Sequence, residues 1–400
     1  MKQRAEHQAA LKRRDFLGIL GAGAVPLAAG LISPDMASGT APRGEAKARR
    51  SSRAVVRIGL IGAGTIVQSR HIPNFRRIPE VELVAVANSS LESSRRVTDS
   101  FGIAKPYANW MELLDDPEID AVMIGTPPYA HSVITIAALE KGKHVLCQSR
   151  MANNAKEARD MLSASRGHPD LVCQLVVGGP QVALGRLLAD GFLGELLSVS
   201  IHRRGADSTS DGFANYDAEL DWRRDPDLNG FNIPLGMGST YESMSGLLGR
   251  ATRVLAMSKV HVPNKRAASG QLVSSVMPDH LDILYELASG AQIQMRISTT
   301  MGLSQGSQTW LYGTNGTIHV DGQRILAGRR GDTRLEEVPA AGAEGPARPP
   351  EEQFVQAIQG TAPPTQGTLE IGVHYMEFSE AVHRSARTGE TVHLPLDTVD

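Results

Sequence analysis

A glycine turn after an apolar run near residue 60 constrains the fold of this chain more than any other feature. Residues 55–61 are rich in β-branched side chains and almost continuously apolar, as in a parallel strand that is covered on both faces. Gly62 and Gly64 then permit a sharp turn, and the following helix would present free N–H groups to a pyrophosphate. The last position of this G-x-G-x-x-G pattern is usually small but is Val67 here. Such a turn can also bind nothing, so a dinucleotide site requires further strand–helix units downstream.

Strand and helix patterns alternate from this turn to residue 177. After the first strand, apolar runs predict strands at 81–88, 121–128, 144–147 and 171–177, with helices at 131–141 and 154–163. This alternation predicts an α/β fold that begins with a Rossmann domain, a doubly wound parallel sheet, at 54–178.

Beyond Gly178 the pattern changes to consecutive strands joined by short turns. Residues 329–350 are Gly/Ala/Pro-rich and are expected to be loop, followed by two helices and a closing strand. Earlier strands are predicted at 196–204, 253–262, 280–288, 291–299 and 309–320, and helices at 181–190 and 239–248. We therefore predict a C-terminal α+β domain at 179–400 with a mostly antiparallel, open-faced sheet.

The composition limits the classes of partner. The 400 residues suffice for two domains, and 41% of them are hydrophobic, which is ordinary for a globular protein. A formal net charge of -2 gives no electrostatic reason to expect nucleic acid, so small molecules are the favoured partners. Cys147 and Cys173 lie in apolar runs and are expected in the core without a disulfide. The histidines lack ligand spacing, and no metal site is predicted.

The first residues carry a targeting pattern. Arg13-Arg14-Asp15-Phe16-Leu17 precedes a mild Gly/Ala-rich apolar stretch that is too short for a comfortable membrane span. This predicts a twin-arginine signal at 1–34, a linker at 35–53 and a periplasmic or exported protein, tethered to the membrane if the signal stays uncleaved. A basic tail that contains two arginines by chance is the alternative.

The end of the second strand bears on the choice of cofactor. Asn88 stands where a Rossmann domain usually presents an acid to the adenine ribose. Because no carboxylate stands at this position, a 2′-phosphate would not be repelled there. Arg95 and Arg96 follow on the next helix. Together these features slightly favour NADP over NAD. Ser89 and Glu92 also fit a helix capping box, and the arginines also fit a solvated helix face. Both interpretations stay open.

Several motifs in order along the chain together resemble the Gfo/Idh/MocA oxidoreductases over about residues 55–395. They are Ile58-Gly-Leu-Ile-Gly-Ala-Gly64, Thr126-Pro127 with His131, Gly142-Lys-His-Val-Leu-Cys147, Trp222-Arg223, Leu311-Tyr-Gly-Thr-Asn-Gly-Thr317 and Ser385-Ala-Arg-Thr-Gly389. The resemblance implies an NAD(P)-binding Rossmann domain and a C-terminal domain that holds substrate and mediates oligomerisation. It also implies hydride transfer on sugars, cyclitols or related polyols.

The resemblance assigns site residues by position. The implied cofactor contacts are Gly62, Gly64, Thr65 and Ile66 along the pyrophosphate, Asn88 by the adenine ribose, and Thr126, Pro127, His131 and Gln148 toward the nicotinamide. His131 also fits a helix residue with only a packing role. The implied substrate contacts are Ser149, Arg150, Trp222, Arg223, Asn232 and Thr240, with a structural role for Trp222-Arg223 as the alternative.

The catalytic motifs of the family are changed in this chain. Members usually carry Glu-Lys-Pro where this chain has Gln148-Ser149-Arg150, and a serine hydroxyl cannot replace a tuned lysine in proton transfer near neutral pH. Arg150 stays protonated and can orient an anion or carbonyl without accepting a proton. Arg150-Met151 resembles a divergent branch of the superfamily that carries Arg-Met at this place.

A second family signature, Asp-x-Gly-x-His-x-x-Asp, is also altered. Gly236, Thr240 and Ser243 stand at its acidic and histidine positions. Tyr241 and Glu242 are weak catalytic candidates, because Glu242 lies about 200° around the helix from position 240. Glu242 is otherwise expected to be solvent-exposed or structurally paired, and Tyr241 to be a core or interface aromatic.

Three functions remain in view from the sequence. The first is an exported oxidoreductase that holds NADP or NAD tightly, acts on a sugar or polyol, and forms a homo-oligomer through its C-terminal sheet. The second is an NAD(P)-using lyase or glycosidase without net redox change. The third is a binding protein for nucleotide or sugar that has lost turnover, which the missing lysine and histidine favour.

Overall fold

The computed structural model describes residues 55–177, 182–205, 213–216, 229–230, 236–267, 269–322, 324–339, 348–363 and 367–397. The predicted signal at 1–34 and the predicted linker at 35–53 lie outside the described residues. In the described part of the chain, no helix has the length and apolar character needed to cross a bilayer.

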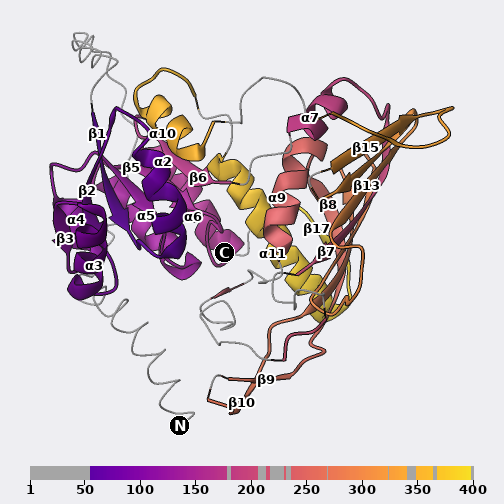
Figure 1. Cartoon of the computed structure of the whole chain (residues 1–400), viewed down its shortest axis with the longest axis horizontal. Coiled ribbons are helices and arrows are strands. Elements are labelled where there is room, and N and C mark those ends of the chain that lie inside the picture. The colour runs from indigo at the N-terminus through magenta and orange to yellow at the C-terminus, as the bar shows by residue number, and fades with distance from the viewer. Residues whose placement is uncertain are drawn as a thin grey trace, which may run out of the picture. The chain divides into compact units, whose positions relative to one another are not determined.

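The first sheet has six parallel strands in the order β3-β2-β1-β4-β5-β6 (Figure 1). The strands are β1 (Val56–Ile61), β2 (Val81–Ala87), β3 (Lys105–Tyr107), β4 (Ala121–Ile124), β5 (His144–Gln148) and β6 (Cys173–Val176). The helices between them are η1 (Val67–His71), α2 (Ile72–Phe75), α3 (Leu91–Phe101), α4 (Trp110–Asp115), η2 (Pro128–Ala130), α5 (His131–Glu140) and α6 (Ala155–Gly167). The predicted Rossmann sheet is therefore confirmed.

The strand order places the ligand crevice of such a sheet. The chain moves outward from β1 to β2 and β3, and then returns to the other side of β1 with β4. Ligands of open α/β sheets bind outside the carboxyl ends of the strands at this reversal. The loops that follow β1, β4 and β5 are consequently the first place to look for a site.

The sequence prediction missed β3 and α4. Both are short, and β3 is an edge strand of the sheet.

The second sheet has nine strands in the order β16-β15-β14-β13-β7-β12-β11-β8-β17. Neighbouring strands of this sheet pair antiparallel except β7 and β12, which are parallel, so the predicted mostly antiparallel sheet is confirmed. The strands are β7 (Leu196–Arg204), β8 (Ala251–Lys259), β11 (His280–Leu287), β12 (Gln292–Ser298), β13 (Gln308–Gly313), β14 (Gly316–Asp321), β15 (Arg324–Arg329), β16 (Glu336–Glu337) and β17 (Val392–His393). A separate hairpin joins β9 (Asn264–Arg266) and β10 (Leu272–Ser274).

Two boundaries in this region were predicted wrongly. The single strand expected at 309–320 is the hairpin of β13 and β14, which turns at Thr314 and Asn315. The Asn315-Gly316 pair is a strong hairpin signal that the strand pattern on both sides concealed. The loop expected at 329–350 contains the short strand β16, which pairs with β15.

Helices α9 (Met237–Leu248) and α11 (Leu369–Thr388) cover one face of the second sheet (Figure 1). Tyr241 of α9 stacks on Phe378 of α11 at 3.7 Å between ring centroids, and both rings contact Tyr285 of β11 edge-on. The opposite face of the sheet leaves apolar side chains in solvent, among them Met257, which is 74% exposed. The second sheet is thus packed on one side only, as an open-faced sheet should be.

The C-terminal helices also complete the first sheet. Phe354 and Val355 of α10 (Pro350–Ile358) are buried in the same apolar cluster as Ile58 and Leu60 of β1. Glu377 of α11 forms an ion pair with Arg159 of α6 at 2.7 Å. The remaining helix, α7 (Val182–Ala189), precedes β7.

Candidate functional site

The glycine turn leaves an open approach at the end of β1. Gly62 has φ of +79°, and a Cβ there would lie 2.6 Å from the backbone nitrogen of Thr126, so a side chain is excluded. A Cβ at Gly64 would meet no atom within 4 Å. Thr65 and Ile66 begin the helix and are exposed, although Ile66 is apolar. An open backbone at a helix N-terminus fits the phosphates of a dinucleotide.

The contact of Val67 with Gly125 explains how the turn tolerates a large residue at the third motif position. Its side chain is 1% exposed and lies against Gly125, where a Cβ would approach Val67 Cγ2 to 2.2 Å. Close packing of helix on sheet requires one small residue at this contact. In this chain the small residue lies at the end of β4 instead of on the helix.

Asn88 links the turn to the next helix. Its Oδ1 accepts a hydrogen bond from the Ala63 backbone at 2.7 Å, and its Nδ2 donates to the carbonyl of Ser93 at 3.1 Å. The residue predicted to contact the adenine ribose therefore also holds the shape of the glycine turn.

The start of α3 differs from the predicted capping box. The N-cap is Ser90, whose hydroxyl accepts from the Ser93 backbone at 3.2 Å, so the box lies one residue later than the predicted Ser89–Glu92 pair. Glu92 instead pairs with Arg96 at 2.6 Å on an exposed helix face. This pairing supports the solvated-face interpretation of Arg96 and gives NADP no added support.

Three buried polar atoms in the loops after β4 and β5 have no hydrogen-bond partner within the described residues. They are Thr126 Oγ1, Arg150 Nε and Asn153 Oδ1. Buried polar groups are nearly always paired, and exceptions need a physical reason. Their concentration at the carboxyl edge of the sheet, beside the open glycine turn, fits a polar ligand such as a nicotinamide nucleotide.

His131 lies beneath these loops. It is fully buried, and its ring nitrogens lie 2.6 Å from the carbonyl oxygen of Thr126 and 2.8 Å from that of Arg150. Burial lowers the pKa of His131 to about 4, although hydrogen bonds to these carbonyl groups oppose the shift. The ring is therefore uncharged near neutrality and donates its single N–H to one of the two carbonyl groups. Pro127, in the loop after β4, is half-buried.

Gln148 belongs to a buried network that the sequence did not reveal. Its Oε1 lies 2.8 Å from Nε2 of His71, and Nδ1 of His71 forms an ion pair with Glu351 of α10. Asn74 donates to the other carboxylate oxygen at 3.2 Å. Burial favours a higher pKa for Glu351, but the bonds and charge from His71 and the bond from Asn74 outweigh it and hold the pKa below its ordinary value. The network connects the end of β5 to the helix after the glycine turn.

The start of α9 brings the catalytic candidates into different environments. The Tyr241 hydroxyl accepts from the Ala251 backbone at 3.1 Å, and its ring lies in the aromatic cluster, as expected of a core residue. Thr240 Oγ1 donates to the carbonyl of Gly236 at 2.9 Å. Glu242 differs from the expectation of an exposed or paired acid, because it is 7% exposed and makes no side-chain hydrogen bond or ion pair with any described residue.

Ser149 is half-buried and is joined to Arg150 by a cis peptide bond. Trp222, Arg223 and Asn232, which were predicted to contact substrate, lie outside the described residues. Sequence reasoning missed His71 and Glu351, which are 280 positions apart, and Tyr375 of α11, because no local pattern links residues at such separations.

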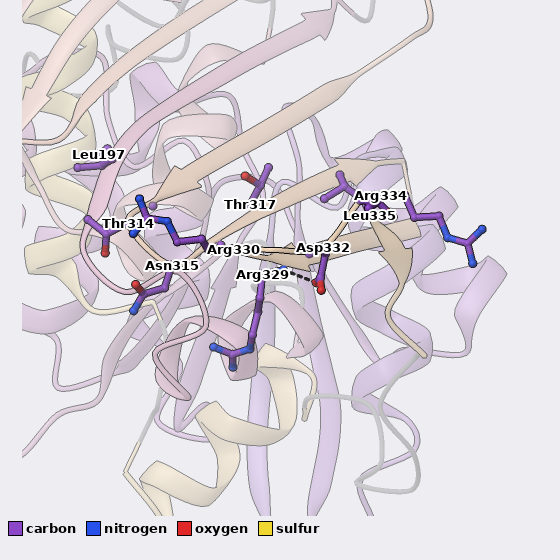
Figure 2. A pocket seen from close by; sticks show the side chains of 13 residues that line it. Leu197, Thr314, Asn315, Thr317, Arg329, Arg330, Asp332, Arg334 and Leu335 are labelled. Carbon is purple, nitrogen blue, oxygen red and sulfur yellow. Dashed lines mark hydrogen bonds between the residues drawn. The ribbon is translucent and has the colours of Figure 1, made fainter.

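A separate open cavity of about 660 Å³ lies at the β13–β14 turn (Figure 2). Thr314 and Asn315 line it together with Arg329, whose backbone N–H donates to Asp332 at 2.7 Å. Thr314 Oγ1 accepts from the Glu195 backbone at 3.0 Å, so the turn holds the loop before β7. The motif at 311–317 therefore has a structural role in this part of the chain.

Two family models match the chain. One, described as an oxidoreductase family with an NAD-binding Rossmann fold, matches residues 56–174. The other, described as the GFO/IDH/MocA C-terminal domain, matches residues 182–319.

Individual relatives agree with these models. An uncharacterised oxidoreductase of Rhizobium meliloti is 39% identical over 103 residues, which are 26% of this chain and 31% of that protein. Levoglucosan dehydrogenase of Pseudarthrobacter phenanthrenivorans is 29% identical over 229 residues, 53% of this chain and 56% of that protein. The matches thus span about a third to a half of these curated relatives. A crystal structure of levoglucosan dehydrogenase with NADH and L-sorbose shares the fold, with a TM-score of 0.72, 20% identity and coverage of 86% of this chain and 100% of that chain.

Proposed function

Because this chain belongs to the Gfo/Idh/MocA family of oxidoreductases, we propose that it binds a nicotinamide dinucleotide at the glycine turn and oxidises or reduces a sugar-like substrate. The observation that carries the proposal is a group of buried polar atoms beside the open turn, Thr126 Oγ1, Arg150 Nε and Asn153 Oδ1, for which the described residues supply no hydrogen-bond partner. A relative that acts on levoglucosan supports the substrate class.

Different residues of the site would bind the nucleotide and orient the substrate. Gly64 and the start of the helix would receive the phosphates, and Asn88 keeps the turn in shape. His131 is buried against the two loops that carry Thr126 and Arg150 and donates its one N–H to a carbonyl group of either loop. The nicotinamide, when bound, supplies the acceptor or donor of hydride. A substrate beside it would lie against Arg150, whose fixed charge can bind an oxygen atom.

We expect the purified protein to bind NAD(H) or NADP(H). Nucleotide released by denaturation would be identified by mass spectrometry, and protein without nucleotide would be titrated with NADH and NADPH by fluorescence. Absence of binding to either would exclude the oxidoreductase and the lyase alternatives together. Tighter binding of NADPH would support the NADP preference, whereas tighter binding of NADH would reject it.

Export with tightly held nucleotide is a further part of the proposal. The twin-arginine pattern at Arg13-Arg14 supports it, because that route carries folded proteins and free nucleotide is scarce outside the cytoplasm. Replacing both arginines with lysine should leave the protein in the cytoplasm when cell fractions are compared. Equal export of both forms would contradict the proposed signal, and exported protein without nucleotide would contradict tight binding.

We propose that the open face of the second sheet joins copies of the chain. Leu255 and Leu284 pair across β8 and β11 and are 39% and 54% exposed, next to the exposed Met257. Exposed apolar side chains grouped on a sheet face mark interaction surfaces. Met257→Glu should lower the mass measured by light scattering, and an unchanged mass would place the contact elsewhere.

A further inference from the structure

Helix α9 begins against the phenol of Tyr375 on α11. A Cβ on Gly238 would lie 2.0 Å from Cε2 of Tyr375 and 2.7 Å from its hydroxyl oxygen, so only glycine permits this approach. Residues four positions apart share one face of a helix. Glu242 therefore lies on the face of α9 that carries Gly238 and meets Tyr375.

The loop after β5, which carries Arg150, lies against α11 about one turn from Tyr375, since a Cβ on Gly372 would lie 2.4 Å from Sδ of Met151. The pKa of Tyr375 is raised chiefly by burial, while the positive charge of Arg150 lowers it and the negative charge of Glu242 raises it. Both charges therefore lie in the neighbourhood of Tyr375. The loop after β5 and the start of α9 both pack against α11 near this residue.

Glu242 makes no side-chain bond to a described residue, and Arg150 Nε is buried without a partner among those residues. Other buried acids nearby are paired, as Glu377 is with Arg159 at 2.7 Å. An isolated buried carboxylate is costly unless something compensates for it. The structural explanation that fits Glu377 does not fit Glu242.

We propose that the Glu242 carboxylate accepts the proton of the substrate hydroxyl and that the Arg150 guanidinium binds the same oxygen. The inference rests on the proposed function of the site. In the oxidation, the O–H bond breaks and its proton passes to Glu242 Oε, while the C–H hydrogen leaves with its electron pair for the nicotinamide ring. The C–O bond becomes a carbonyl group, whose oxygen Arg150 holds. Reduction returns the proton from Glu242.

The acid–base character of Glu242 suits this role. Burial raises the pKa of Glu242 to about 7, so both of its protonation states are populated near neutrality. Among the described residues, Arg150 on the loop after β5 and Glu242 both act electrostatically on Tyr375 of α11. Burial raises the pKa of Tyr375, so between these two acids Glu242 is the one that changes its charge near neutrality.

The assignment is tested with Glu242→Gln, with Glu242→Asp as the conservative variant and Glu286→Gln as the matched control, since Glu286 is a half-buried acid of β11 that is paired with Arg253. Wild-type protein loaded with NAD⁺ is offered levoglucosan and L-sorbose, and with NADH it is offered 1,5-anhydro-D-fructose. Glu242→Gln should slow single-turnover hydride transfer about 10²–10⁴-fold and remove its dependence on pH near 7, with NADH affinity unchanged. Glu242→Asp should restore part of the rate, and Glu286→Gln should match wild type.

Infrared difference spectroscopy provides a readout that needs no turnover. Wild-type protein should show a protonated carboxyl band that disappears as the pH is raised through about 7, and that is missing in Glu242→Gln. Adding at least one of the three sugars to nucleotide-loaded protein should shift this band.

Three results would overturn the role of Glu242: a missing band, a band that no sugar moves, or a Glu242→Gln rate within threefold of wild type. Failure to bind NADH would instead refute the proposed function itself. Arg150→Ala should keep NADH affinity and weaken the band shift that sugar causes. If sugar shifts the carboxyl band of Arg150→Ala as much as that of wild type, Arg150 does not bind the substrate oxygen.

Discussion

Replacing Glu351 with glutamine is expected to lower the free energy of unfolding by about 3–5 kcal/mol, because it leaves buried His71 without its carboxylate partner. Both side chains are fully buried, so water cannot replace the lost interaction. A loss of this size is a large part of the 5–15 kcal/mol or so that keeps a typical domain folded. Urea unfolding at pH 7, followed by circular dichroism, measures it.

The control and the pH dependence make this expectation specific. Glu92→Gln removes an exposed pair and should change stability by less than about 1 kcal/mol. The folded pKa of Glu351 is lowered, so its contribution is present above the ordinary value of 4.5 and is lost as the pH falls through the lowered pKa. The gap between wild type and Glu351→Gln should therefore narrow in acid. Equal stability of wild type and Glu351→Gln at pH 7 would show that the His71–Glu351 ion pair does not stabilise the fold.

Gly125→Ala should destabilise the protein by about 1–3 kcal/mol and weaken nucleotide binding, since the new methyl group would overlap Val67 Cγ2. The overlap pushes the helix after the glycine turn away from the sheet and moves the N–H groups that face the phosphates. Thermal unfolding and NADH titration measure the two effects.

The double variant decides whether this contact is the cause. Val67→Ala removes the overlap with Cγ2, so Val67→Ala with Gly125→Ala should recover part of the stability and affinity that Gly125→Ala loses, while the contact at 2.9 Å with the Gly62 carbonyl oxygen remains. Val67→Ala alone should cost stability by leaving a cavity. Losses that simply add in the double variant would mean that the two residues do not compensate for each other.

Local patterns predicted the central strands of the parallel sheet well because these strands are short and mostly buried apolar runs, whereas the edge strand β3 is not and was missed. All four residues of β4, for example, are buried. The same signal failed at β13 and β14, where the alternation of one strand continued into the next and hid the Asn315-Gly316 turn. Pattern reasoning therefore found where strands lie more reliably than where one strand ends.

The candidate site was predictable only in part. The glycine turn and the loops after β4 and β5 follow from motif positions, because backbone conformation dictates the residues there. Glu242 was expected to be exposed or paired but is buried, because helical geometry gives angles between residues but not which faces are covered. Helix α9 is buried against the sheet and against α11, so Thr240, Tyr241 and Glu242 are all enclosed. The partners of His71 and Arg150 depend on tertiary packing, which local patterns do not contain.

The packing of α10 against the first sheet determines when the core of that sheet can be completed during synthesis. Phe354 and Val355 fill the apolar core around β1, yet almost 300 residues separate them from that strand. A ribosome must therefore translate most of the message before the nucleotide-binding half can close its own core. Until then that half exposes the apolar surface that α10 later covers. Its completion is a late event of synthesis, although its sequence is made first.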